Sequence, residues 1–165
     1  AYMPVQDFGN AFSFFVAQNY GAKKYARIRK GFLLALVSVL IFCLVISAAV
    51  FGFADTLMGF FTNEGSAISA ACAEYLRVEG AFYVGIGILF LLYGYYRAVD
   101  KPVVSVVLTI ISLGTRVILA YALTGLFHTG VIGIWAAIPI GWGLADLVGM
   151  VGIVSSFRGH FFRFP

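Results

Sequence analysis

Charged side chains are scarce in this chain of 165 residues. Lys, Arg, Asp and Glu make up 11% of it, against about 25% in an ordinary soluble domain. Hydrophobic residues make up 62%, and the mean hydropathy is +0.99. A soluble fold of this length leaves roughly a third of the surface of its unfolded chain exposed, and this chain has too few polar side chains to cover it. The composition therefore excludes a soluble globular protein and predicts one that is embedded in a lipid bilayer.

Cysteine and histidine are also rare, which narrows the possible chemistry. The chain has two cysteines, Cys43 and Cys72, and two histidines, His128 and His160. The cysteines lack a Cys-x-x-Cys spacing and the histidines lie far apart, so these residues are more typical of packing positions than of a metal site. The sequence also lacks the paired acids or clustered histidines that a membrane-embedded enzyme would need. We therefore expect no enzymatic activity, no bound metal and no cofactor.

Long apolar segments, in contrast, are abundant, and a helix needs about 20 apolar residues to cross the hydrocarbon core of a bilayer. Four segments meet this requirement, the second of them with the help of an amphipathic lead-in: 31–54, 66–97, 103–127 and 131–155. A fifth apolar segment, residues 1–19, starts without an initiator methionine or a flanking loop, and we interpret it as the latter part of a helix. The expected fold is all-α: a polytopic membrane protein built as an antiparallel transmembrane helix bundle.

The basic residues gather on alternate connections between these segments. Nine of the eleven Lys and Arg residues lie in three places, whereas the connections 55–64 and 124–130 contain none. By the positive-inside rule these three places face the cytoplasm: residues 20–30, 97–102 and the tail 156–165. We therefore expect a multi-pass protein of the cell membrane (plasma or inner membrane) with a cytoplasmic C-terminus. The basic clusters suit anionic lipid head groups, so membrane lipids are expected partners and nucleic acid is not.

Polar side chains within the apolar segments mark functional positions or bonds between helices, since each of them is costly in a bilayer. Segment 103–127 carries four such residues at helical spacing, on one face: Ser105, Thr109, Ser112 and Arg116. Segment 131–155 carries a stripe with the same spacing: Trp135, Pro139, Trp142 and Asp146. The expected depths of Arg116 and Asp146 differ by only about 7–8 Å. We predict that these two side chains interact, either as a fixed ion pair or with a role in transport.

Two other segments carry polar groups as well. The first segment has Gln6, Asp7, Asn10 and Ser13, and the outer part of 66–97 has Glu79 and Tyr83. Polar groups on four helices can line one water-accessible cavity, or they can bond one another across helix contacts. The residues alone leave both possibilities open.

Several runs of residues occur in an order that is typical of one transporter family. They are Met3–Phe12, Phe15–Ala22, Glu74–Arg77, Tyr96–Arg97, Thr115–Val117, Ala120–Tyr121 and Gly133–Trp142. This ordered set resembles the second half of the multidrug and toxic compound extrusion (MATE) proteins. The resemblance extends over nearly the whole chain, up to about Ser155.

The resemblance implies two six-helix lobes that alternate access to a central cavity and export organic cations in exchange for H⁺ or Na⁺. It places this chain from the end of the eighth helix to the twelfth, in the second lobe. The N-terminal lobe of the same protein would then be a partner of this segment. Aromatic faces and carboxylates suit bulky organic cations. The candidate substrate-binding residues are Gln6, Asp7, Asn10, Tyr83 and Trp142.

One stretch departs from the family pattern. Some MATE proteins carry a cation-binding carboxylate about three turns before the arginine that Arg97 matches, where this chain has Tyr83–Ile88 and no acid. We therefore expect the site for the coupling ion, H⁺ or Na⁺, to lie outside this segment. Two alternatives stay open: a lipid-linked precursor flippase of the same superfamily, which would need a more cationic cavity, and a non-transporting structural membrane module.

Overall fold

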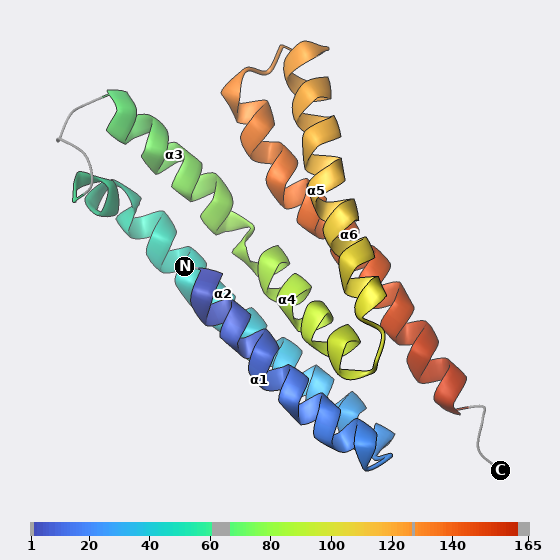
Figure 1. Ribbon diagram of the computed structural model, residues 1–165. Helices are drawn as coiled ribbons and strands as arrows, with labels where there is room; N and C mark the ends of the chain where they lie inside the picture. The colour runs from blue at the N-terminus through green and yellow to red at the C-terminus, as the bar shows by residue number, and fades with distance from the viewer. Residues whose placement is uncertain (1, 61–66, 127, 162–165) are drawn as a thin grey trace.

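The part of the chain that the structure describes is helical throughout, apart from short connections (Figure 1). The computed structural model describes residues 2–60, 67–126 and 128–161. These residues form six α-helices: α1 (Tyr2–Gly21), α2 (Tyr25–Gly59), α3 (Ala67–Ala81), α4 (Tyr83–Ala98), α5 (Pro102–Gly125) and α6 (Val131–Phe161). The predicted all-α fold class is confirmed.

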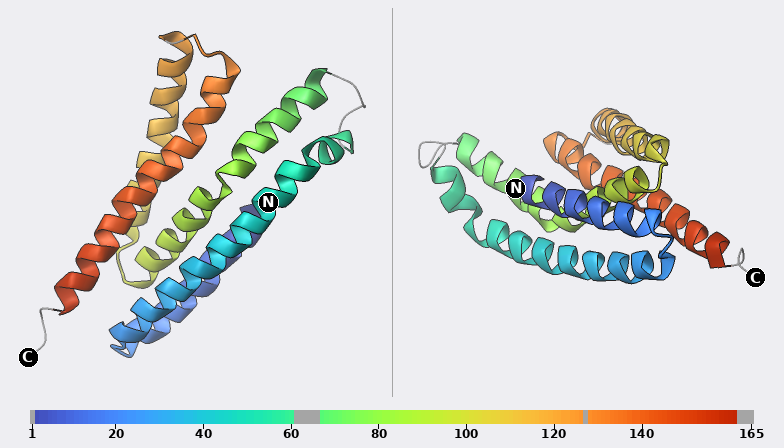
Figure 2. Two further views of the ribbon diagram at one scale, coloured as in Figure 1. Left: turned by 180° about the vertical axis from the view of Figure 1, so that it is seen from behind. Right: turned by 60° about the horizontal axis from the view of Figure 1, so that its bottom comes forward.

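Helix α4 lies at the centre of the arrangement. Helices α1 and α2 pack along one side of it, and the hairpin of α5 and α6 packs along the other (Figures 1 and 2). A helix that is surrounded in this way must be apolar around most of its circumference. Accordingly, α4 buries Leu89 and Leu92 on one face and Leu91 on another.

The outer surface of the bundle is strongly apolar. Leu34, Ile41, Ile110 and Val151 are each at least 60% exposed. Such a surface is unfavourable in water, but it is the surface that a bilayer requires. Helices α2, α5 and α6 are long and apolar enough to cross a membrane, and α3 with α4 forms a fourth candidate span. Composition and fold therefore agree on a multi-pass membrane protein.

The segment 66–97, expected to be one helix, is two. Helices α3 and α4 meet at an angle of 52°, with the break at Phe82. The N–H groups of Phe82 and Gly85 bond to carbonyls three residues back, so the regular ladder is interrupted there. Carbonyls in the last turn of a helix need partners from elsewhere, and that of Gly80 accepts a hydrogen bond of 2.6 Å from the Ser47 hydroxyl of α2. The expectation of one continuous helix is therefore wrong.

Two other boundaries differ from the expected ones. Helix α2 covers Tyr25–Gly59 and not only 31–54, because the Lys and Arg residues before the apolar run are good helix formers. Helix α6 continues to Phe161, so most of the expected tail 156–165 is helical. Helices α1 and α5 match their expected segments to within a few residues. Four parts of the expected segments lie outside the described chain: residues 1, 66, 127 and 162–165.

The three basic parts of the chain lie at one end of the bundle. The α1–α2 connection, the α4–α5 connection and the C-terminal end of α6 are all at this end, and the α5–α6 connection is at the opposite end (Figure 1). This is the geometry that a positive-inside pattern requires of a bundle in a membrane.

Candidate functional site

Two charged side chains from the middle of α5 and α6 lie near Trp142 of α6, which is 1% exposed. The Arg116 guanidinium of α5 lies over its indole ring, with Cζ 5.3 Å from the ring centroid, where a cation is attracted to the aromatic face. Gly141 makes this approach possible, because a Cβ there would lie 2.6 Å from the Ser112 carbonyl oxygen and 2.9 Å from Arg116 Cγ. On the α4 side the ring meets Gly85, where a Cβ would lie 3.4 Å from Trp142 Cβ.

Asp146 lies one turn further along α6 and is 8% exposed. Its Oδ1 is buried and has no hydrogen-bond partner among the described residues. The Nε of Arg116 is likewise buried without a described partner, while a terminal N–H of the same guanidinium donates to the Ser112 hydroxyl at 3.5 Å. Because buried polar groups are normally bonded, these incompletely satisfied groups are candidates for a functional site within the spans.

Arg116 and Asp146 do not form a direct ion pair. Among the residues that the structure describes, the one ion pair joins Arg77 of α3 to Asp55 of α2, with the nitrogen and oxygen 2.5 Å apart, and the sequence analysis missed it. Arg116 and Asp146 share a neighbour instead, since both lie within electrostatic range of the Tyr93 hydroxyl of α4. An interaction between them through shared neighbours stays a prediction.

The polar stripe of α5 faces α4. The Ser105 hydroxyl donates to the Tyr93 carbonyl at 3.5 Å, and Ser112 is buried. The Thr109 and Tyr93 hydroxyls form a hydrogen bond of 3.2 Å. Tyr93 is therefore the α4 partner of the stripe, and the sequence analysis did not single it out. In the sequence, Tyr93 stands out only as a phenol within a strongly apolar run, one turn before Arg97.

The candidate residues on α1 point in different directions. Gln6 and Asp7 are exposed, and no described helix covers them. Asn10 is half-buried, and its Oδ1 accepts a hydrogen bond of 3.4 Å from the Arg97 guanidinium of α4. The structure therefore assigns Asn10 a bond between helices, while Gln6 and Asp7 stay on an open face.

The two remaining candidates lie on opposite sides of α4. Tyr83 is buried, within electrostatic range of Cys43 on α2. Trp142 belongs to α6, on the other side of α4 from α1 and α2 (Figure 2). The structure thus does not bring the five candidate substrate-binding residues into one wall.

Comparison with known proteins decides the family. Residues 1–122, well over half of the chain, match the MatE family. The chain belongs to the MatE family. The match ends within α5, so Trp142 and Asp146 of α6 lie beyond the matched part of this MatE chain.

Two relatives place the MatE chain within longer proteins. The multidrug export protein MepA of Staphylococcus haemolyticus is 25% identical over 130 residues, which are 76% of this chain and 28% of that protein. A solved structure is described as the inward-facing conformation of a multidrug resistance MATE family transporter of the MOP superfamily. It matches with a TM-score of 0.83 at 18% identity, over 96% of this chain and 38% of that one, and shows that the fold is shared.

A second polar cluster of the MatE chain lies between α3 and α6. The Tyr75 and Glu79 side chains form a hydrogen bond, and Glu79 is 8% exposed. The rings of Tyr75 and Trp135 pack with centroids 5.7 Å apart. The sequence analysis named Glu79 and Trp135 separately but did not single out Tyr75, because their contact depends on how α3 and α6 pack.

The chemistry available in these clusters is that of binding. Within the described ranges, no group of three or more His, Cys, Asp or Glu side chains is placed to hold a metal ion. What the spans offer is carboxylates, phenols and indoles, which bind cations through Coulomb and cation–π attraction, with the Arg116 guanidinium already placed over the Trp142 ring.

Proposed function

We propose that this chain forms part of the second lobe of a secondary active transporter that exports organic cations in exchange for H⁺ or Na⁺ by alternating access. Membership of the MatE family supports this, as does the relative named as a multidrug export protein. The chain spans 28% of that relative. Transport is therefore proposed for the complete protein, in which the N-terminal lobe is the partner of this segment.

The exposed carboxylate of Asp7 is the observation that carries the proposal. Asp7 lies fourteen positions before the end of α1 at Gly21, which puts it about 21 Å from the basic end of the bundle and deep in the bilayer. A carboxylate facing lipid at that depth would cost about 2.5–3.5 kcal/mol even on the lenient insertion scale. A water-filled cavity next to this face of α1 removes that cost, and a carboxylate in its wall attracts organic cations.

We place the coupling site for H⁺ or Na⁺ outside this segment. Tyr83–Ile88 contains no acid where some MATE proteins carry one. A flippase for lipid-linked precursors would need cationic side chains on the cavity face to hold pyrophosphate. Arg116 instead lies against Trp142, on the side of α4 away from α1. The geometry therefore favours export of cations.

The proposed orientation follows from the charges. The basic end of the bundle faces the cytoplasm, with the C-terminal end of α6 on that side and the connection between α5 and α6 outside the cell. The cell membrane is the proposed location, and its anionic lipids are proposed contacts of the basic clusters.

Replacement of Asp7 in the complete protein tests the proposal. Cells that lack their own multidrug exporters are loaded with a cationic dye such as ethidium, and the rate of dye efflux is measured. Asp7→Asn should lower the rate about tenfold or more, because a charge-assisted contact to the cation is lost. Asp100→Asn removes the same charge from the exposed α4–α5 connection and should leave efflux close to that of the unmodified protein.

Full efflux by Asp7→Asn at equal expression would contradict the assignment of Asp7 to the cavity. If Asn10→Ala and Asp146→Asn also left efflux unchanged, the structural-module alternative would replace transport by this lobe. Selective loss of lipid-linked precursor translocation, with dye efflux retained, would instead support the flippase.

A further inference from the structure

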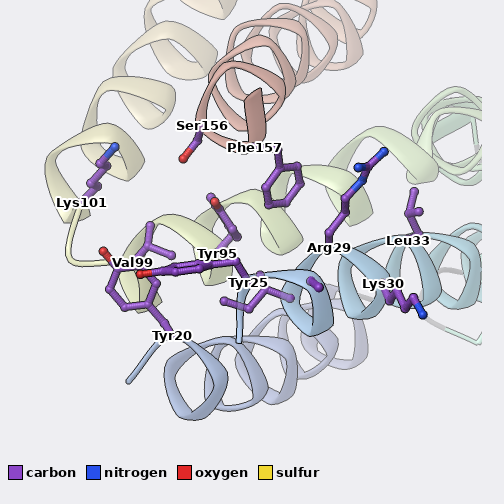
Figure 3. A pocket seen from close by; sticks show the side chains of 12 residues that line it. Tyr20, Tyr25, Arg29, Lys30, Leu33, Tyr95, Val99, Lys101, Ser156 and Phe157 are labelled. Atoms are coloured by element: carbon purple, nitrogen blue, oxygen red, sulfur yellow. The ribbon is translucent and has the colours of Figure 1, made fainter. Parts of the chain in front are cut away.

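A cavity of about 510 Å³ lies at the basic end of the bundle, remote from Asp7 and Trp142. It forms where the connection between α1 and α2 meets the ends of α4 and α6 (Figure 3). Its aromatic lining comes from all four of these helices: Tyr20, Tyr25, Tyr95 and Phe157. None of these residues belongs to the clusters described above.

The aromatic lining is held by contacts between helices. The Tyr95 and Phe157 rings pack edge to face with centroids 5.9 Å apart, and Phe32 packs edge to face against Phe157 at 6.3 Å. The Tyr95 hydroxyl also forms a side-chain hydrogen bond with Ser156. Such an arrangement offers a preformed cavity, which lowers the cost of ordering side chains when a ligand binds.

Three cationic side chains stand around this aromatic group. Arg29 and Lys30 come from the first turns of α2, and Lys101 precedes α5. In Figure 3 the Tyr95 and Phe157 rings lie between Arg29 and Lys101. Within the described parts of the chain none of the three cations forms an ion pair, although Asp100 is adjacent to Lys101 in sequence. The cavity therefore carries positive charge that a bound anion would neutralise.

The residues at the edge of the cavity indicate which kind of anion it can bind. Leu33 lines the cavity and is also 54% exposed, so the cavity continues onto the apolar outer face of α2. Leu34 and Val37 extend that face, with 70% and 53% of their side chains exposed. A ligand that fits both parts has an anionic phosphate for the cations and an acyl chain for the face of α2.

We propose that this cavity binds the head group of an anionic phospholipid from the cytoplasmic leaflet. Its phosphate lies at the edge of the cavity beside the Arg29 guanidinium, which donates charge-assisted hydrogen bonds, while Lys101 on the opposite side of the rings adds to the positive charge of the cavity. One acyl chain follows Leu33 along α2. The choice of leaflet rests on the orientation proposed above, but the site uses none of the residues assigned to the substrate cavity.

Lipid titration of the detergent-purified complete protein tests the site. Short-chain phosphatidylglycerol, phosphatidylcholine with the same acyl chains, and glycerol 3-phosphate are each titrated while heat release is measured by calorimetry. The phosphatidylglycerol should bind at one site per protein, and the double variant Arg29→Gln, Lys101→Gln should weaken it about tenfold or more. The matched double variant Lys23→Gln, Arg27→Gln removes two charges nearby but outside the cavity lining and should have a much smaller effect.

The other outcomes overturn the proposal. Equal weakening by both double variants would mean that only the general positive charge of this end attracts lipid. Equal binding of phosphatidylcholine would remove the need for an anionic head group. Glycerol 3-phosphate binding as tightly as phosphatidylglycerol would assign the cavity to a soluble phosphate ester. An unchanged melting temperature of the variants shows that they are folded when these comparisons are made.

Discussion

At the scale of single residues, Trp142 is adjacent to two charged groups in the middle of spans, Arg116 and Asp146. Arg116 stacks on its ring from α5, and Asp146 follows one turn later on α6. Neither charge has a direct ionic partner among the described residues, and each has a buried atom without a described hydrogen bond. The question is whether the two charges are buried independently of each other, or whether each lowers the free-energy cost of burying the other.

A double-mutant cycle on Arg116 and Asp146 answers this question. Arg116→Met and Asp146→Asn should each lower the melting temperature of the complete protein in detergent, because each leaves the other charge uncompensated. The double variant should lose less than the sum, with a coupling of about 0.5–2 kcal/mol. Arg77→Met with Asp55→Asn is the matched cycle for the exposed pair, where about 0–1 kcal/mol is expected. Strict additivity at Arg116 and Asp146 would refute their interaction.

At the scale of helices, the contact between α1 and α4 depends on two facing glycines. A Cβ at Gly94 would collide with the Gly9 carbonyl oxygen, and a Cβ at Gly9 would lie 2.6 Å from the Phe90 carbonyl oxygen. Because both obstacles are backbone atoms, they cannot move aside as a flexible side chain would. Backbones in such contact gain packing energy that larger residues would prevent.

Alanine substitutions distinguish this contact from glycine effects in general. Gly94→Ala should destabilise the complete protein by about 1–3 kcal/mol, because α1 and α4 must move apart. Gly114→Ala is the matched control, since a Cβ at that position of α5 meets nothing within 4 Å. It should be neutral or slightly stabilising, through the better helix propensity of alanine. Equal melting temperatures for the two variants would show that the close approach contributes nothing.

The helices themselves were predictable, because about 20 apolar residues in a row have few other folds in a bilayer. The break at Phe82 was not predictable, since the apolar pattern runs through it and Ser47, which bonds Gly80, comes from another helix. The same limit applies to the site. Spacing placed Arg116 and Ser112 on one face of α5, but the directions of Tyr83 and Tyr93 depend on how α4 is rotated among its neighbours.

At the scale of the whole molecule, charge is distributed along the axis of the bundle. Among the residues that the structure describes, eight Lys and Arg residues belong to the three chain segments at one end. The exposed ion pair of Asp55, near the other end of α2, and Arg77 of α3 lies away from these segments. A bundle with this asymmetry has one favoured orientation, because basic segments are retained on the cytoplasmic side during insertion.

Labelling of single cysteines in intact cells tests this orientation. In the complete protein with every native cysteine replaced, including Cys43→Ala and Cys72→Ala, either Thr129→Cys or Asp100→Cys is introduced. Thr129 lies in the α5–α6 connection and Asp100 in the α4–α5 connection, and both are exposed. A membrane-impermeant maleimide should label Thr129→Cys from outside and Asp100→Cys only after permeabilisation. The opposite pattern would invert the proposed topology, and with it the assignment of the cationic cavity to the cytoplasmic leaflet.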